Sequence, residues 1–106
     1  MDITTTETLP GRRITSVKGV AVGSTIRTKH IGKDIGAGLK SLVGGELKSY
    51  SDMLTEARAQ ALSRMEEQAV QLGADALINL RFMTSSVASG ASEILAYATA
   101  VTTEPS

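Results

Sequence analysis

Apolar residues recur every three or four positions between about residues 46 and 72, which is the spacing of one helical face. Gly44 and Gly45 precede this stretch and Gly73 follows it, as expected where a helix begins and ends. Such a helix would be roughly 40 Å long, whereas a compact chain of this length is only about 33 Å across. We therefore expect the helix either to break near its start or to lean on neighbouring subunits, and we favour an oligomer. The apolar positions are Leu47, Tyr50, Leu54, Ala57, Ala61, Leu62, Met65, Ala69 and Leu72.

The helix has two candidate starting points. The glycine pair would place the start near Glu46. Ser49 and Asp52 have the spacing of a capping box, which would move the start to Tyr50. The alanines of the apolar face are small, so they predict a close approach to a sheet or to another helix.

Two β-rich segments lie before the helix. Residues 2–8 and 13–27 are predicted strands, and Leu9-Pro10-Gly11 between them has the composition of a type II turn. The apolar positions of the second strand change parity near Gly19. A bulge or bend there would restore a single apolar face.

Two further strands are predicted after the helix. The apolar residues Ala76, Ile78, Leu80 and Phe82 lie at alternate positions, which predicts a one-sided strand. Residues 84–92 read as a loop of small residues that closes a hairpin. The strand at 93–101 is apolar on both faces, which predicts burial on both sides. One helix cannot cover both faces, so a second subunit is expected. Residues 102–106 are predicted to be a frayed tail. The pattern predicts a single domain, residues 1–106, with these strands and one long amphipathic helix.

Composition narrows the classes of function. The net charge of the 106-residue chain is zero, so no charge excess would attract nucleic acid or an acidic membrane surface. Cysteine is absent, which excludes disulfides, a thiolate nucleophile and thiolate metal ligands. No apolar run approaches the roughly 20 residues that span a bilayer. The N-terminal residues lack the pattern of a signal peptide, and a cytoplasmic protein is expected.

A glycine-rich stretch before the helix raises the hypothesis of phosphate binding. The detailed pattern departs from known motifs, because Leu39 separates Gly38 from Lys40-Ser41 and no glycine stands at position 41. We favour a tight connection in which glycine is required sterically, with one short helical turn within residues 34–43. The candidate ligand-binding residues are Gly32, Lys33, Asp34, Gly36, Gly38 and Lys40.

His30 and Asp34 are the candidate metal ligands, four residues apart. One histidine cannot fill a tetrahedral site from a single chain. In a ring, copies of His30 from several subunits could converge on the axis. An exposed loop histidine is the interpretation that we favour, and a metal ion is the one cofactor considered.

Arg58 falls inside the apolar arc of the predicted helix. An arginine there must extend to solvent along its stem or meet a carboxylate. We favour a structural or interface pair over a catalytic role, because a single histidine and the lack of a nucleophile motif leave little support for catalysis. Candidate partners within the chain are Glu46, Asp75 and Glu93, or a neighbour's acid.

Four segments carry a family resemblance: TTTETLPGRRI, IGKDIGAGLKSLVGGELKSYSDMLTEAR, LGADALINLRF and EILAYATAV. They resemble the bacterial YbjQ-like family over nearly the whole chain. The family is often given a heavy-metal-binding label and has no settled activity. The resemblance implies an α+β subunit, with one long helix packed on a mostly antiparallel sheet, that assembles into a ring-shaped homopentamer. The metal label fits poorly on a chain with one histidine and no cysteine.

These observations favour a non-enzymatic, cytoplasmic homo-oligomer that binds a small ligand or metal ion at subunit junctions. The expected protein partner of each subunit is another copy of the same chain. Two alternatives stay open. One is an enzyme of unknown reaction whose site forms between subunits. The other is a structural scaffold with no ligand of its own.

Overall fold

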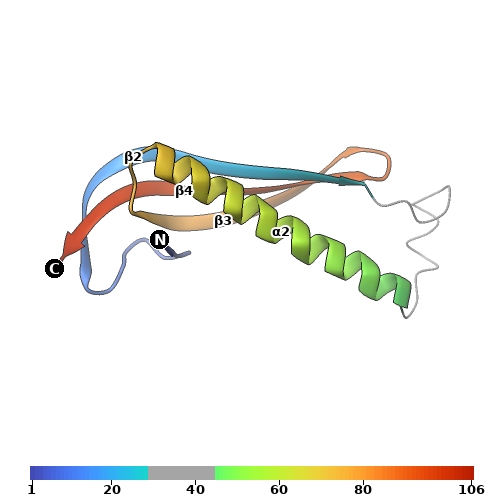
Figure 1. Cartoon of the computed structure of the whole chain (residues 1–106), viewed down its shortest axis with the longest axis horizontal. Helices are drawn as coiled ribbons and strands as arrows, with labels where there is room; N and C mark the ends of the chain where they lie inside the picture. Colours follow the sequence, from blue (N-terminus) through green and yellow to red (C-terminus); the bar gives the residue numbers. More distant parts are fainter. Residues whose placement is uncertain (29–44) are drawn as a thin grey trace.

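The computed structural model, which describes residues 1–28 and 45–106, places one long helix on one face of a four-stranded sheet (Figure 1). The strand order is β1-β3-β4-β2. β1 runs parallel to β3, and the other two pairs are antiparallel, so the expected α+β class with a mostly antiparallel sheet is confirmed. The elements are β1 (Asp2–Ile3), β2 (Arg12–Thr28), α2 (Gly45–Gln71), β3 (Ala76–Ala88) and β4 (Ala91–Pro105).

Helix α2 is continuous over 27 residues, so it does not break near its start. It begins at Gly45, and the prediction of a start at Tyr50 is therefore wrong. The helix ends as predicted, with Gly73 at φ 80°. The Gly73 amide donates to the Val70 carbonyl, and the Ala74 amide donates to the Ala69 carbonyl, each over 3.0 Å. This pair of bonds is the Schellman pattern.

The molecule accommodates the long helix by being elongated. Its principal extents are 54 × 23 × 16 Å, and its radius of gyration is 17.2 Å. A compact chain of this length would have a radius of gyration of about 13 Å. The elongated subunit therefore leaves much of its sheet near the surface.

The helix lies very close to the sheet, as its alanines predict. Ala57, Ala61, Met65 and Ala69 recur every four residues along α2 and are fully buried. Opposite them, β2 has a glycine at position 23, where a Cβ atom would overlap the Ala61 carbonyl oxygen and the Met65 amide nitrogen. The sheet side of this layer is also built from small residues: Ala21, Ala96, Ala98 and Ala100.

The N-terminal segment is less regular than predicted. Only Asp2–Ile3 forms a strand, rather than residues 2–8. Beyond it, Thr4 and Thr6 continue to bond to β3: the Thr4 amide donates to the Leu77 carbonyl, and the Thr6 carbonyl accepts from Asn79. The threonines bond to one another through their hydroxyls, and such side-chain bonds compete with a regular ladder.

The predicted turn and bulge of the first half are both confirmed. Gly11 has φ 78°, and the Arg12 amide donates to the Leu9 carbonyl over 3.1 Å. Gly19 has φ 131° and lies at a register shift between β2 and β4. A second shift lies between Ile14 and Ser16.

The hairpin is longer and tighter than predicted. Instead of a loop over residues 84–92, β3 continues to Ala88 and β4 begins at Ala91. Gly90, at φ 76°, allows the chain to reverse within two residues. The serine and threonine of this stretch suggested a loop, but threonine and valine also favour strands.

The C-terminal residues do not fray. β4 continues to Pro105, which pairs with Arg12, and the Ser106 amide donates to the Gly11 carbonyl over 3.1 Å. The Asp75 carboxylate accepts bonds from the Thr103 amide and hydroxyl. These hydrogen bonds hold the last residues of the chain against the sheet. The polar sequence of this segment does not indicate them, because their partners lie far away in the sequence.

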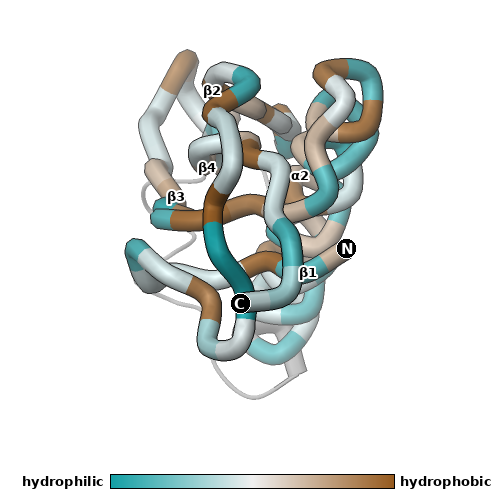
Figure 2. Tube along the Cα trace, turned by 90° about the vertical axis from the view of Figure 1, so that its left-hand side faces the viewer, coloured by the Kyte–Doolittle hydropathy of each residue, from teal (hydrophilic) through white to brown (hydrophobic). Residues whose placement is uncertain are grey.

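We call the face of the sheet that points away from α2 the open face; among residues 1–28 and 45–106, apolar side chains cover it at one end. There Leu9 and Ile14 pack on Ala76, Ile78 and Val101. Along the rest of β2, apolar side chains lie at the surface, and Val20 and Ile26 are each 62% exposed. Figure 2 shows apolar stretches of the trace in the strands of this sheet. The apolar residues on the helix side of the sheet form the core with α2. Away from that end, the helix-side residues of β4 from Ile94 to Ala100 are buried, whereas Leu95, Tyr97 and Thr99 on its open face are half-buried.

Candidate ligand site on the open face of the sheet

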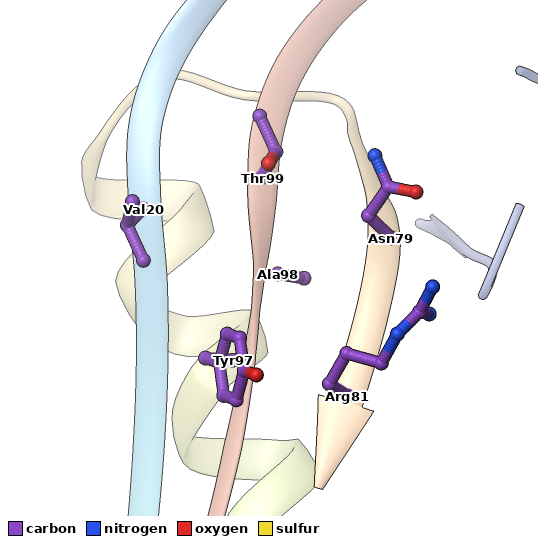
Figure 3. Close-up of a pocket in the computed structure, with 6 residues that line it drawn as sticks. All are labelled: Val20, Asn79, Arg81, Tyr97, Ala98 and Thr99. Atoms are coloured by element: carbon purple, nitrogen blue, oxygen red, sulfur yellow. The ribbon is translucent and has the colours of Figure 1, made fainter. Parts of the chain in front are cut away.

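A hollow of about 310 Å³ lies on the open face, where β2, β4 and β3 run side by side (Figure 3). Helix α2 lies behind the sheet in this view. The volume is at the lower end of the range of small-molecule sites. The lining residues are Val20, Asn79, Arg81, Tyr97, Ala98 and Thr99.

A bulge in β3 forms one wall of the hollow. Ile78 pairs with Thr99 and Arg81 pairs with Tyr97, so two residues of β3 lie opposite Ala98 alone. Asn79, the first of the two, has φ 56°, a left-handed conformation that asparagine tolerates better than most residues. Its amide nitrogen donates to the Thr6 carbonyl over 3.0 Å. The N-terminal segment thus holds the bulge in place, and bulges often lie beside functional sites.

Arg81 brings a positive charge to the same wall. Its Nη1 donates to the carbonyls of Thr5 and Leu80, over 3.1 and 2.7 Å. Within the described ranges, the ion pairs involve only the N-terminal amine with Glu66 and Arg13 with Glu104. Arg81 therefore has no carboxylate partner in that part of the chain, and its charge is available to a ligand or a neighbouring subunit.

Tyr97 forms the central surface of the hollow from β4, half-buried between Val20 and Arg81. Its ring offers a flat apolar surface, and its hydroxyl can donate or accept a hydrogen bond. The six lining residues include no histidine or carboxylate, so this wall holds no nucleophile and base in partnership. The arrangement suits binding of a small molecule that has an apolar body and a polar or anionic end.

Most of the site residues predicted from the sequence lie outside the described residues. This applies to the loop set (Gly32, Lys33, Asp34, Gly36, Gly38 and Lys40), to the metal candidate His30 and to the short helical turn predicted within residues 34–43. The structure neither supports nor opposes these hypotheses.

Arg58, by contrast, is described and exposed on α2. Its Nη2 donates to the Thr55 hydroxyl one turn earlier, over 3.2 Å. Asp75, one of its candidate partners, bonds to Thr103 instead. Arg58 therefore reaches solvent along its stem within the subunit, and a partner from a neighbouring subunit stays a prediction.

The side chains that could ligate a metal ion are scattered in the described part of the chain. It contains no group of three or more histidine, cysteine or acidic side chains that could hold a metal ion. Soft metals select thiolate and thioether ligands. The chain has no cysteine, and of its methionines Met65 is buried in the core, whereas Met1 and Met83 are exposed.

The hollow itself was not predicted from the sequence. Asn79 and Arg81 occupy the polar positions of an alternating strand, and such positions normally lie on a solvated face. One signal was present: asparagine is depleted in strand interiors and enriched at left-handed positions, so Asn79 could have indicated the bulge.

Comparison with known proteins shows the family to which the chain belongs. The model of a family described as "Putative heavy-metal-binding", the YbjQ family, matches residues 1–104. The chain belongs to this family. Proteins titled "UPF0145 protein" are similar to it, at 60% identity over 101 residues in Methanosarcina acetivorans and 56% over 101 residues in Vibrio campbellii. The alignments cover 95% of this chain in both cases, and 95% and 97% of the relatives. The YbjQ family thus includes archaeal as well as bacterial proteins.

A crystal structure supports the fold. It is of a protein of unknown function from Pediococcus pentosaceus, assigned in its title to the DUF74 family. The two structures superpose with a TM-score of 0.66 at 19% identity, covering 98% of each chain. Among the described helices of our protein, none is long and apolar enough to cross a membrane.

Proposed function

We propose that this YbjQ-family protein is a cytoplasmic homo-oligomer, a ring-shaped pentamer as the family resemblance implies, that binds a small ligand at the junctions between subunits. The observation that carries the proposal is the hollow at Tyr97 on a sheet face where the described residues leave apolar side chains of β2 exposed. A neighbouring subunit on that face would enclose the hollow.

The shape of the subunit supports assembly. An elongated chain with a radius of gyration of 17.2 Å buries less of its surface than a compact one. The exposed side chains of β2 on the open face are β-branched and apolar, at Val17, Val20, Val22 and Ile26. Exposed apolar side chains that gather along one strand are typical of an interaction surface.

The chemistry of the wall supports a ligand with a polar or anionic end. Tyr97 supplies an apolar surface, and Asn79 and Arg81 supply hydrogen-bond donors at the β3 side of the hollow, where the Arg81 guanidinium extends away from the ring (Figure 3). A guanidinium recognises carboxylate and phosphate groups, because its planar fork matches their oxygens. The lining residues offer no acid–base pair, and this favours binding over the enzyme alternative.

The family description supports a second candidate, a metal ion at the ring axis. The ligands would have to come from several chains, with His30 and Asp34 repeated around the axis. This donor set contains imidazole and carboxylate but no sulfur, so it selects weakly among metals.

A thermal-shift screen of small molecules tests the proposed function. We expect compounds with a carboxylate or phosphate to raise the melting temperature of the wild-type oligomer. The Tyr97→Ala variant should lose that shift, measured from its own baseline, whereas Tyr50→Ala on the helix should keep it. Ligand shifts that survive Tyr97→Ala would contradict a site at the hollow. A screen in which no compound shifts the wild type would favour the scaffold alternative.

A further inference from the structure

Glu93 is an unpaired carboxylate on the open face of the sheet. It lies opposite Ile26 of β2 and Ser85 of β3, whereas the next residue, Ile94, lies in the core on the helix side. Glu93 is half-buried, and it has no hydrogen-bond or ion-pair partner within the described residues. The other acidic side chains whose burial is described are either exposed or bonded. Glu93 is therefore a half-buried charge that this part of the subunit leaves uncompensated.

A neighbouring subunit that encloses the hollow would also cover Glu93. Four residues of β4 separate Glu93 from Tyr97, a distance of about 13 Å. Ile26, directly opposite Glu93, is one of the exposed apolar side chains of β2. An ionised carboxylate that loses its water is costly unless a cation or hydrogen-bond donors replace it. The surface that covers the open face is therefore expected to carry a cation.

Arg58 is the arginine that the subunit leaves available for this role. Among the described residues its guanidinium bonds only to Thr55, on the same helix. Every other arginine bonds to a different segment of the subunit: Arg12 to Thr103, Arg13 to Glu104, Arg27 to Gln60, Arg64 to Ser24 and Arg81 to Thr5. The planar guanidinium suits a covered ion pair, because its fork matches the two oxygens of a carboxylate.

The surroundings of Arg58 also match those of Glu93. Leu54 and Leu62, one turn away on either side, pack against the core and stay half-buried. Arg58 thus lies between apolar side chains at the surface of α2. On the open face, Glu93 lies beside Ile26 and Leu95, which are apolar as well. Each surface therefore offers apolar contacts around one charge, and the two charges are opposite.

We propose that Arg58 of one subunit pairs with Glu93 of its neighbour, with α2 of the first subunit packed on the open face of the second. The two residues lie on opposite sides of the sheet, so they cannot pair within one chain. The contact uses two different surfaces of each subunit, and such head-to-tail contacts form a ring when the rotation closes. The proposal rests on the ring of the proposed function and names the two surfaces that would form it. Helix α2 of the neighbour would then close the hollow at Tyr97.

Charge reversal tests the pair by native mass. Glu93→Arg and Arg58→Glu each place like charges together, so we expect each variant to fall below the wild-type mass with an unchanged circular dichroism spectrum. The double variant, Arg58→Glu with Glu93→Arg, restores opposite charges and should recover the wild-type mass. The control Glu67→Arg, on the exposed face of the helix, should keep that mass.

Neutral variants measure the coupling and decide the matter if a reversed variant fails to fold. We expect Glu93→Gln and Arg58→Gln each to weaken assembly roughly tenfold or more, as the loss of one member of a covered charge pair does. The double neutral variant should assemble no more weakly than the weaker single variant, because paired residues are not additive. Sedimentation across a dilution series measures all three, with Glu67→Gln as the control.

The outcomes separate this pair from the ring itself. A wild-type mass of one chain would overturn the pair together with the proposed function. An assembled wild type whose mass survives both reversals would overturn the pair and leave the ring standing. A folded double reversal that stays dissociated, or additive losses in the neutral series, would also overturn the pairing of Arg58 with Glu93.

Discussion

At the scale of the residue, Gly23 determines how closely the helix approaches the sheet. The backbone of α2 occupies the space that a Cβ atom at this position would need. Four small or unbranched residues of the helix, spaced four apart, lie fully buried around it. Because the contacts come from backbone proximity rather than from large side chains, this layer has little room to adjust.

We predict that Gly23→Ala destabilises the fold by about 1–3 kcal/mol, the usual cost of forcing extra volume into a packed core. The added methyl group would push the helix backbone away at Ala61 and Met65. Denaturant unfolding measures the effect. The neighbouring Ser24→Ala, on the opposite face, should change stability by less than about 0.5 kcal/mol. Equal stability of the two variants would contradict the close approach.

Arg58 is predicted to act between subunits. Within the subunit it bonds only to Thr55 among the described residues, so its loss should cost the isolated chain little. In the oligomer it is expected to meet a neighbour's carboxylate. Arg58→Ala should then weaken assembly roughly tenfold or more, as the loss of an interfacial charge pair does. Sedimentation across a dilution series measures this, with Thr55→Ala as the matched control. Unchanged assembly would mean that Arg58 is merely solvated.

At the scale of the element, the helix could be predicted well from the sequence and the strand ends could not. The four-residue spacing of Ala57, Ala61, Met65 and Ala69 is local, and so is the glycine that ends the helix. The extension of β3 through residues 84–88, and of β4 through residues 102–105, depends instead on partners far along the chain. Tertiary pairing therefore overrode the weak loop preference of small polar residues.

The hollow could not be predicted for a similar reason. It joins residues of β2, β3 and β4 that are brought together only by strand register. The register of β3 changes at Asn79, where the amide bonds to Thr6 from the other end of the chain. A bulge fixed by such a distant partner has no local pattern beyond the asparagine itself.

Helix α2 also protects the edge of β2, and this role is testable. Gln68→Leu removes the acceptor of the Val22 amide without shortening the side chain greatly. One hydrogen bond contributes about 0.5–1.5 kcal/mol, so we expect that amide to exchange with solvent roughly fivefold faster. Gln71→Leu, at the end of the helix, should leave its exchange unchanged. Hydrogen exchange followed by NMR measures both, and an unaltered rate in Gln68→Leu would argue against the capping role.

At the scale of the whole molecule, the subunit is elongated, and one face of its sheet is open along β2. The helix covers the other face with small side chains, so the sheet receives most of its burial from one side. An assembled neighbour would bury the apolar strip of β2 and enclose the hollow at Tyr97. The same contact between subunits would then stabilise the assembly and complete the ligand site.

Metal binding is predicted to be weak in the intact protein. Calorimetry with zinc, copper and nickel should find no stoichiometric, sub-micromolar binding, because imidazole and oxygen ligands alone select weakly. Any weak binding through His30 should fall as the pH drops through about 6.5, the ordinary pKa of histidine, since neutral imidazole is the ligand form. Tight binding that His30→Ala abolishes without loss of the fold would refute this prediction.

The native mass tests the central claim most directly, because every site proposed here lies between subunits. Multi-angle light scattering or native mass spectrometry of the wild-type protein measures it. The account predicts five times the chain mass of 11.1 kDa, for a single ring. A mass near 11.1 kDa at working concentration would contradict the account.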